Sequence, residues 1–276
     1  MPAFVCATCG VQQAPTEPPA SPPATCPICA DERQWVPPGG QVWTTMAELL
    51  AGGRRVELRE LEPGLLGVGC APSFAIGQRA LLVTTPAGNL LWDCVSVLDD
   101  EAEAAVAALG GIAAIACSHP HFHGAMVEWA DAFGAELLVP EADLAWVQRP
   151  DPAVRTWSGR LELLPGLTLV QCGGHFDGSA VLHWAAGAGG LGALLVGDTA
   201  TVTPDRNLSF MRSYPNLIPL PPATVARIAG TLLELDFDRV YGGWWERVVP
   251  SGGRDAVRRS AERYQRWAGA KEPPAG

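Results

Sequence analysis

The chain of 276 residues is long enough for one large domain plus a small module, and 48% apolar with 17% charged residues is typical of a globular protein. The formal net charge is −10 and no basic cluster occurs, which argues against nucleic acid or an anionic membrane as the main partner. No segment resembles a signal peptide or a membrane span, so we expect a cytoplasmic protein with reduced cysteines.

Four of the eight cysteines form two C-x-x-C pairs near the start of the chain, Cys6 with Cys9 and Cys26 with Cys29. This spacing is typical of a site in which four thiolates surround one metal ion. We therefore predict a zinc-ribbon-like module and linker over residues 1–40, with a Pro-rich loop between the two pairs. Zinc is the expected ion, but the pairs also resemble those of rubredoxin, so iron stays open.

Residues 41–276 are predicted to form one α/β domain in which strands alternate with helices. Turn signals, apolar runs and capping residues give the elements in chain order. The expected strands are Leu65–Cys70, Ala80–Thr85, Leu90–Trp92, Ile112–Cys117, Leu137–Val139, Leu167–Gln171, Ala180–Trp184, Leu191–Val196 and Arg239–Tyr241. The expected helices are Met46–Ala51, Asp99–Leu109, Ala125–Phe133, Glu141–Val147, Ala223–Leu235 and Gly253–Trp267.

The segment after the strand Ile112–Cys117 holds three of the five histidines at alternating positions, His119, His121 and His123. Alternate residues of an extended chain point the same way, and Pro120 favours extended backbone at the residue before it. We therefore expect His119 and His121 to lie on one side of a strand end and to bind one metal ion, since imidazole is the commonest protein ligand for zinc-like ions.

Three further strands end in residues that suit a metal site. Asp93 follows one strand, Gly174-His175-Phe176-Asp177-Gly178-Ser179 another, and Gly197-Asp198 a third. Together with the histidine segment, in this order, these motifs resemble those of the metallo-β-lactamase superfamily. The resemblance covers about residues 56–243. It implies a four-layer αβ/βα sandwich with metal bound at the edge of two facing sheets.

The resemblance also implies roles for these residues. His119, His121 and His175 would bind a first metal ion, and Asp198 would bind the metals and orient a water. Asp93 would assist catalysis by accepting a hydrogen bond from a histidine, or it caps the chain. His123 stands where the family has an acid, so it is either a substitute ligand for a second ion or a loop residue.

Other polar residues allow two interpretations each. Asp177 is a turn former or a base near the metal, and His183 fits a histidine of the sheet better than a ligand. Where the family has its last histidine, this chain has Trp244, which lines the substrate pocket or packs. Arg212 and Tyr214 lie in a predicted loop after Asp198 and are candidate substrate-binding residues, with Arg212 suited to a carboxylate or phosphate.

These features predict a metal-dependent hydrolase of a small ester, thioester, lactone or phosphoester, acting through metal-bound hydroxide. The substrate would be a small molecule. One alternative is a non-catalytic or ligand-binding protein with a degenerate metal site. A less favoured alternative is an iron-dependent oxidoreductase, because a four-cysteine module joined to this fold resembles flavodiiron proteins. The sequence does not fix the oligomeric state.

Overall fold

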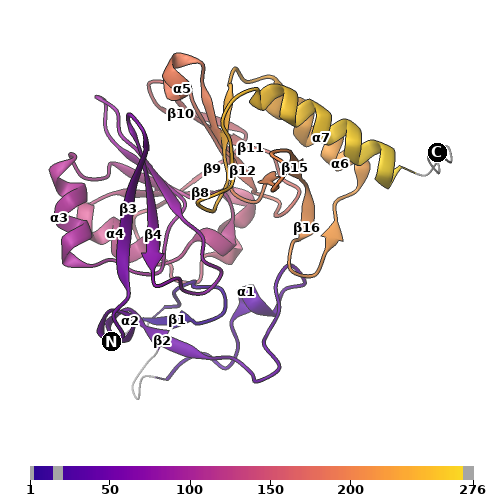
Figure 1. Cartoon of the computed structure of the whole chain (residues 1–276). Helices are drawn as coiled ribbons and strands as arrows, with labels where there is room; N and C mark the ends of the chain where they lie inside the picture. The colour runs from indigo at the N-terminus through magenta and orange to yellow at the C-terminus, as the bar shows by residue number, and fades with distance from the viewer. Residues whose placement is uncertain (1–2, 15–20, 270–276) are drawn as a thin grey trace. The chain divides into compact units, whose positions relative to one another are not determined.

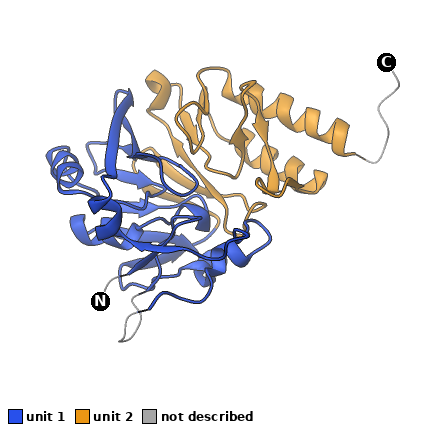
Figure 2. Cartoon of the chain, turned by 60° about the horizontal axis from the view of Figure 1, so that its bottom comes forward, with its two compact units in different colours: residues 1–158 blue, residues 159–276 orange. Residues whose placement is uncertain are grey.

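The computed structural model describes residues 3–14 and 21–269 (Figure 1). The chain divides into two compact units, Met1–Ser158 and Gly159–Gly276, which Figure 2 shows in different colours. Each unit contains one large sheet and the helices that pack on it. The middle of the predicted Pro-rich loop, residues 15–20, lies outside the described residues.

Unit 1 is built on a seven-stranded sheet in which the strands follow one another in chain order, β3 to β9. The pairs from β3 to β6 are antiparallel, and those from β6 to β9 are parallel. The strands are β3 (Arg55–Glu62), β4 (Leu65–Ala71), β5 (Ala80–Val83), β6 (Leu90–Trp92), β7 (Ala114–Ala116), β8 (Glu136–Pro140) and β9 (Val154–Trp157).

The helices α3 (Asp100–Ala108) and α4 (Met126–Phe133) connect the parallel strands of this sheet. Val106 of α3 and Trp129 of α4 join Leu91 and Ile115 in one buried apolar cluster. Asp99 caps α3 by accepting a hydrogen bond from the backbone N–H of Ala102, as a helix N-terminus requires. The sheet is thereby covered on this face, and β7 is held with its C-terminal end at the sheet edge.

The first part of the chain belongs to unit 1. Its strand β1 (Phe4–Cys6) pairs with β2 (Trp43–Thr45), so the cysteine segment is closed at both ends by backbone hydrogen bonds. The short helix α1 (Pro27–Ala30) lies between them, and α2 (Met46–Ala51) follows β2 directly. Thr45 and Glu48 form a capping box that fixes the start of α2 where the sequence predicts it.

Unit 2 is built on a six-stranded sheet with the order β10-β11-β12-β13-β18-β19. Only the β13–β18 pair is parallel, because α6 and the segments before it separate these two strands in the chain. The strands are β10 (Arg160–Leu164), β11 (Leu167–Gln171), β12 (Ala180–Trp184), β13 (Ala193–Leu195), β18 (Arg239–Tyr241) and β19 (Val248–Val249).

Two long helices cover this second sheet, α6 (Pro222–Leu233) and α7 (Gly253–Ala268). Ile228 and Leu232 of α6 and Val257 of α7 share an apolar cluster with Val181 and Leu194 of the sheet. Shorter elements fill the connections: α5 (Gly187–Gly190), the pair β14 (Thr201–Val202) with β15 (Leu208–Ser209), and the pair β16 (Met211–Ser213) with β17 (Ile218–Pro219).

Two segments of unit 1 form 3-10 helices. Residues 141–147, predicted as a helix, form the 3-10 helix η2 (Glu141–Trp146), which has no side-chain cap and leaves Leu144 45% exposed. His119 is extended, as Pro120 predicts, but residues 120–122 form the 3-10 turn η1 (Pro120–Phe122), so the extended backbone assumed for the pair His119 and His121 does not continue past His119. Proline is well suited to the first position of a helical turn, because its fixed φ is already helical and its missing N–H needs no partner there. Within the described residues, no helix is both long and apolar enough to cross a bilayer.

Candidate metal centres

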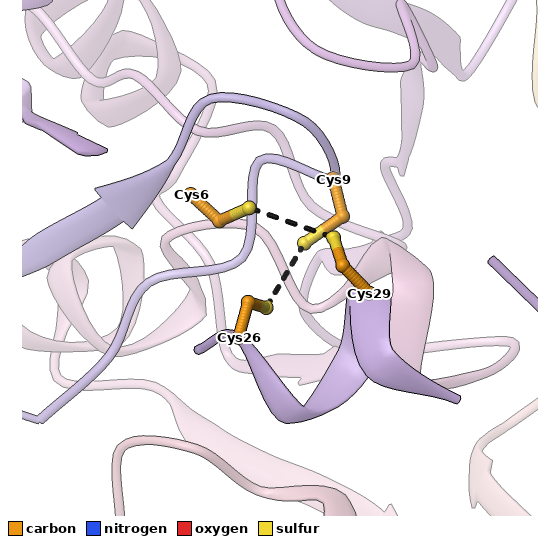
Figure 3. A group of neighbouring side chains, drawn as sticks. All are labelled: Cys6, Cys9, Cys26 and Cys29. Atoms are coloured by element: carbon orange, nitrogen blue, oxygen red, sulfur yellow. Dashed lines mark hydrogen bonds between the residues drawn. The ribbon is translucent and has the colours of Figure 1, made fainter. Parts of the chain in front are cut away.

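The four predicted cysteine ligands come together in unit 1 (Figure 3). Cys6 and Cys9 lie at the end of β1 and in the turn after it, and Cys26 and Cys29 lie at the start and within α1. All four sulfurs lie within 4.8 Å of one another, with Sγ–Sγ distances of 3.6 Å for Cys6–Cys29 and 3.7 Å for Cys9–Cys26. Four sulfurs bound tetrahedrally to zinc at about 2.3 Å lie about 3.8 Å apart. The cluster therefore has the spacing of a four-thiolate metal site.

Two side-chain amides and the neighbouring thiols surround the sulfurs of Cys6 and Cys26. The side-chain amide of Gln41 donates to Sγ of Cys6 at 2.9 Å, and that of Gln13 lies 3.9 Å from Sγ of Cys26. Hydrogen bonds from the neighbouring thiols, first that of Cys26, hold the pKa of Cys6 well below its usual range, whereas burial raises the pKa of Cys9 and the hydrogen bond with Cys26 raises that of Cys29. Thiolates are the form that binds metal, so the donor set fits an ion such as zinc or iron.

The segment that carries the histidines is fixed by Asp93, which follows β6. The carboxylate Oδ1 of Asp93 accepts a hydrogen bond of 2.7 Å from the backbone N–H of Ser118. Asp93 itself has a positive φ of 65°, a conformation that aspartate tolerates better than most residues. The contact ties the end of β6 to the end of β7. Asp93 therefore positions the residue directly before His119.

His119 and His121 lie close together although the backbone between them is not extended. Their rings are 5.0 Å apart between centroids at an interplanar angle of 77°, and both side chains are buried. The hydroxyl of Ser118 lies 2.9 Å from Nδ1 of His119. The two imidazoles thus lie together in unit 1, and it is the turn at Pro120, rather than strand alternation, that brings them together. Their role as metal ligands stays a prediction.

His123 occupies a different environment in the same turn. Its side chain is buried, and its Nδ1 has no hydrogen-bond partner among the described residues. Burial lowers the pKa of His123 to about 4, so the imidazole is neutral at pH 7. It lines a cavity of about 10 Å³ with Val11, Gln12 and Gly124 among others, which is room for about one water molecule. Its role as a second-site ligand stays a prediction.

The residues that follow the first cysteine pair, Gly10 to Gln12, are hydrogen-bonded to the histidine turn and to the connection beside it. The sequence does not reveal these contacts. The backbone N–H of Gln12 donates to the carbonyl of Gly124 at 2.9 Å, and the Gln12 side chain donates to Glu128 at 3.1 Å. Arg149 Nη1 donates to both Gln12 and Glu128. The hydroxyl of Ser96 donates to the carbonyl of Gly10 at 2.7 Å. These contacts seat the turn against the residues that follow Cys9.

In unit 2, His175 follows β11 after a pair of glycines. Its Nδ1 lies 3.2 Å from the carbonyl oxygen of Met211. A carbonyl only accepts, so Nδ1 carries the proton and Nε2 is the nitrogen with a lone pair for a metal. Gly174 has a φ of +100°, and a Cβ there would lie 2.7 Å from Cδ1 of Ile228, so a side chain at this position would clash with α6. The close packing of Gly174 against α6 therefore fixes the backbone position of the next residue, His175.

Asp198 follows β13 and is 5% exposed. Its Oδ1 accepts a hydrogen bond of 2.6 Å from the hydroxyl of Thr201, which fixes the plane of the carboxylate. Burial raises the pKa of Asp198 to about 6, although the Thr201 bond acts in the opposite direction. A nearby cation would favour the ionised form. The predicted ligand is therefore buried and oriented in unit 2.

A cavity of about 340 Å³ opens beside Asp198 within unit 2. It is lined by Asp198, Thr201, Tyr214, Trp244 and Arg247. Two of the three predicted substrate-binding residues, Tyr214 and Trp244, line it, whereas Arg212 lies in β16 outside this lining. Arg247 and Thr201 were missed by the sequence analysis, because a lone arginine or threonine without a motif carries no signal.

The other residues considered, His183, Asp177 and the four isolated cysteines, have the surroundings of residues that support the fold. His183 of β12 places Nε2 at 2.7 Å from the carbonyl oxygen of Asp236, which fits the predicted histidine of the sheet. The backbone carbonyl of Asp177 accepts a hydrogen bond from Gln171 in the turn after β11. Cys94, Cys117 and Cys172 are buried free thiols whose pKa burial raises, and Cys70 is partly buried.

Comparison with known proteins places the chain in a family. It is 47% identical over 267 residues, 96% of both chains, to the protein named "Uncharacterized protein YmaE" of Bacillus subtilis (strain 168). The chain belongs to the YmaE family. A scan against protein-family models finds no match.

Solved structures with the same fold are metallo-β-lactamases. A metallo-β-lactamase from Cronobacter sakazakii with a HARLDQ motif matches with a TM-score of 0.51 at 18% identity, over 79% of this chain and 96% of that one. The DIM-1 metallo-β-lactamase matches with a TM-score of 0.56 at 12% identity, over 76% of this chain and 97% of that one. At these identities the likeness establishes the fold, and the chain has the predicted metallo-β-lactamase fold.

Proposed function

We propose that this YmaE family member is a metal-dependent hydrolase of a small ester, thioester, lactone or phosphoester. The observation that carries the proposal is the buried pair His119 and His121 at the end of β7, two adjacent imidazoles 5.0 Å apart between ring centroids. Neutral imidazole is the commonest protein ligand of zinc-like ions, and two imidazoles this close together suit one shared ion.

We propose that His175 and Asp198 of unit 2 bind the same ion as His119 and His121, as the resemblance to the superfamily implies. The chemistry of the donor set fits, since neutral imidazoles and a carboxylate are ligands that zinc accepts. When bound, such an ion lowers the pKa of water and polarises a carbonyl or phosphoryl oxygen.

The chain's own residues would orient the reactants. Thr201 holds Oδ1 of Asp198, so the carboxylate keeps one orientation in which it accepts a proton from an attacking water. Asp93 keeps Ser118, and with it His119, in place through a hydrogen bond to the backbone. Tyr214 donates its hydroxyl proton to the carbonyl of Ser209 and accepts from the N–H of Thr201, which fixes one wall of the cavity beside Asp198.

We further propose zinc as the ion of the four-cysteine cluster, which would serve the fold rather than the reaction. We also propose a cytoplasmic location, because two C-x-x-C pairs that bind a metal ion are typical of a reducing compartment. A small molecule is the expected substrate, given the size of the cavity beside Asp198.

Metal analysis combined with turnover tests the proposal. The full chain is purified, its metal content is measured by mass spectrometry, and hydrolysis of 4-nitrophenyl acetate and bis(4-nitrophenyl) phosphate is followed. His121→Ala should remove the ion of the large domain and abolish turnover. His183→Ala is the matched control, since His183 bonds to a backbone carbonyl in unit 2, and it should keep both metal and rate.

Three results would contradict the hydrolase. One is a wild-type protein whose only metal is lost in Cys9→Ser. The second is a His121→Ala variant with unchanged metal content and rate. The third is redox-active iron in place of hydrolysis, which would favour an oxidoreductase.

A further inference from the structure

The cavity beside Asp198 is lined by a positively charged side chain, that of Arg247, which has no role in the proposed hydrolytic centre. Arg247 lies in the turn between β18 and β19 and lines the cavity of about 340 Å³ together with Asp198 and Trp244. The turn itself is held by its backbone, since the N–H of Gly242 donates to the carbonyl of Arg247 and the N–H of Arg247 donates to that of Trp244. The Arg247 side chain is therefore not needed to hold the turn.

Arg247 also lacks a counter-ion within the protein. It is partly buried, yet its guanidinium makes no ion pair or hydrogen bond with the described residues. Other arginines of unit 2 behave differently: the partly buried Arg254 and Arg263 each pair with an aspartate, and Arg227 donates to a backbone carbonyl. A guanidinium is always charged, and partial burial without an anion costs free energy that a bound anion would recover.

Asp198, at another point of the same lining, determines where an anion fits. A second negative group next to this carboxylate would be repelled unless the proposed metal ion neutralised it. The guanidinium of Arg247 offers planar N–H donors whose spacing matches the oxygens of a carboxylate or a phosphate. Trp244 adds an apolar surface to the same cavity, and the cavity has the size of a small-molecule site.

We propose that Arg247 binds an anionic group of the substrate, a carboxylate or a phosphate, that is separate from the bond that is hydrolysed. The inference rests on the proposed function in one respect, because it takes the cavity beside Asp198 to be the substrate site. It narrows the substrate from any small ester, thioester, lactone or phosphoester to one that carries a second, anionic group. Arg247 is then a specificity-determining residue.

Equilibrium binding tests the inference without any turnover. The metal-loaded full chain is titrated calorimetrically with phenylacetate, with its neutral isostere phenylacetamide, and with inorganic phosphate. Phenylacetate should bind more tightly than phenylacetamide, and Arg247→Gln should weaken phenylacetate binding about 10- to 100-fold, the usual worth of a charge-assisted hydrogen-bonded pair. Arg258→Gln removes an exposed arginine of α7 and should leave the preference intact.

Three results of this titration have distinct meanings. Equal binding of acid and amide by the wild type would overturn the inference. Unchanged phenylacetate binding by Arg247→Gln would overturn it too, since the anion would then be held by metal alone. Phosphate binding that exceeds phenylacetate binding and depends on Arg247 would support the inference and identify the anion as a phosphate.

Turnover separates this inference from the proposed function. Mono(4-nitrophenyl) adipate and 4-nitrophenyl hexanoate differ mainly in a terminal carboxylate, and the charged ester should have the lower KM only when Arg247 is present. If hydrolysis depends on His121 but the KM preference is absent, the inference about Arg247 falls and the hydrolase stands. If Arg247-dependent binding occurs without any hydrolysis, the hydrolase falls and the anion site stands.

Discussion

Gly124 connects the histidine turn to α4, and replacing it with alanine should displace the turn. The residue has a positive φ of 49°, and a Cβ at this position would lie 2.7 Å from the carbonyl oxygen of Val95 and 2.9 Å from that of Cys94. Both are backbone atoms of the connection that follows β6, so they cannot move aside as a flexible side chain would. The cost therefore has two parts, strain at the new alanine and a steric clash.

The magnitude follows from these two parts. An L-residue in the left-handed region costs about 1–2 kcal/mol, of which the lower entropy of the unfolded alanine chain offsets about 0.4–1 kcal/mol. Forcing an extra carbon into a packed site adds about 1–3 kcal/mol. We expect Gly124→Ala to lower the free energy of unfolding by about 2–4 kcal/mol.

A matched control isolates the steric part. Gly134 at the end of α4 has a φ of 65°, but a Cβ there would meet no atom within 4 Å. Gly134→Ala should therefore cost only about 0.5–1 kcal/mol, the strain alone. Urea denaturation followed by circular dichroism measures both variants. If the two substitutions destabilised the protein equally, the tight contact between the turn and the end of β6 would be refuted.

Three more predictions concern the metal sites and the contacts that support them. Cys9→Ser should lose the ion of the cysteine cluster and lower the melting temperature, because Cys9 belongs to the buried cluster that holds Val11 and Ile28; an unchanged melting temperature would show that the cluster adds no stability. After metal removal, the raised pKa of Asp198 should make stability fall by about 2–3 kcal/mol as pH rises from about 3.8 to about 6, because the unfolded carboxyl ionises first and the buried one resists. Asp198→Asn should flatten this part of the pH profile, measured by urea denaturation in EDTA, and an identical profile in the variant would exclude Asp198 as its source. Arg149→Met should destabilise unit 1 by about 1–3 kcal/mol, because Gln12 and Glu128 lose a shared charged donor. The control is Arg258→Met, which breaks the exposed ion pair with Asp255; a smaller loss of stability for Arg149→Met than for this control would contradict the link.

Continuous apolar runs made the central strands predictable. The runs Leu90–Trp92, Leu167–Gln171 and Ala180–Trp184 are strands with the predicted bounds, because most of their residues are apolar and buried in the middle of a sheet. The edge strands β9 and β10 were missed. They alternate apolar residues with arginine, threonine or glutamate, since an edge strand is partly exposed, and so they lack the apolar run that marks a buried strand.

The site could be predicted only as far as its motifs reach. The cysteine pairs and the histidine pair follow from spacing, because a metal needs several donors at short range. Arg247 could not be found, since its importance lies in the missing counter-ion, a property of the folded neighbourhood rather than of the sequence. The bond between Gln12 and Gly124 joins residues far apart in the chain through backbone atoms, which every residue possesses.

That backbone bond bears on how shortened versions of the protein should be made. A fragment that begins at residue 41 would leave the carbonyl of Gly124 and the charged pair of Glu128 and Arg149 without Gln12, and it would remove β1 from its partner β2. Such a fragment would carry the histidines but would lack the residues on which their turn packs. Residues before position 41 therefore support the position of the histidine turn, and versions of the protein made for metal binding should include them.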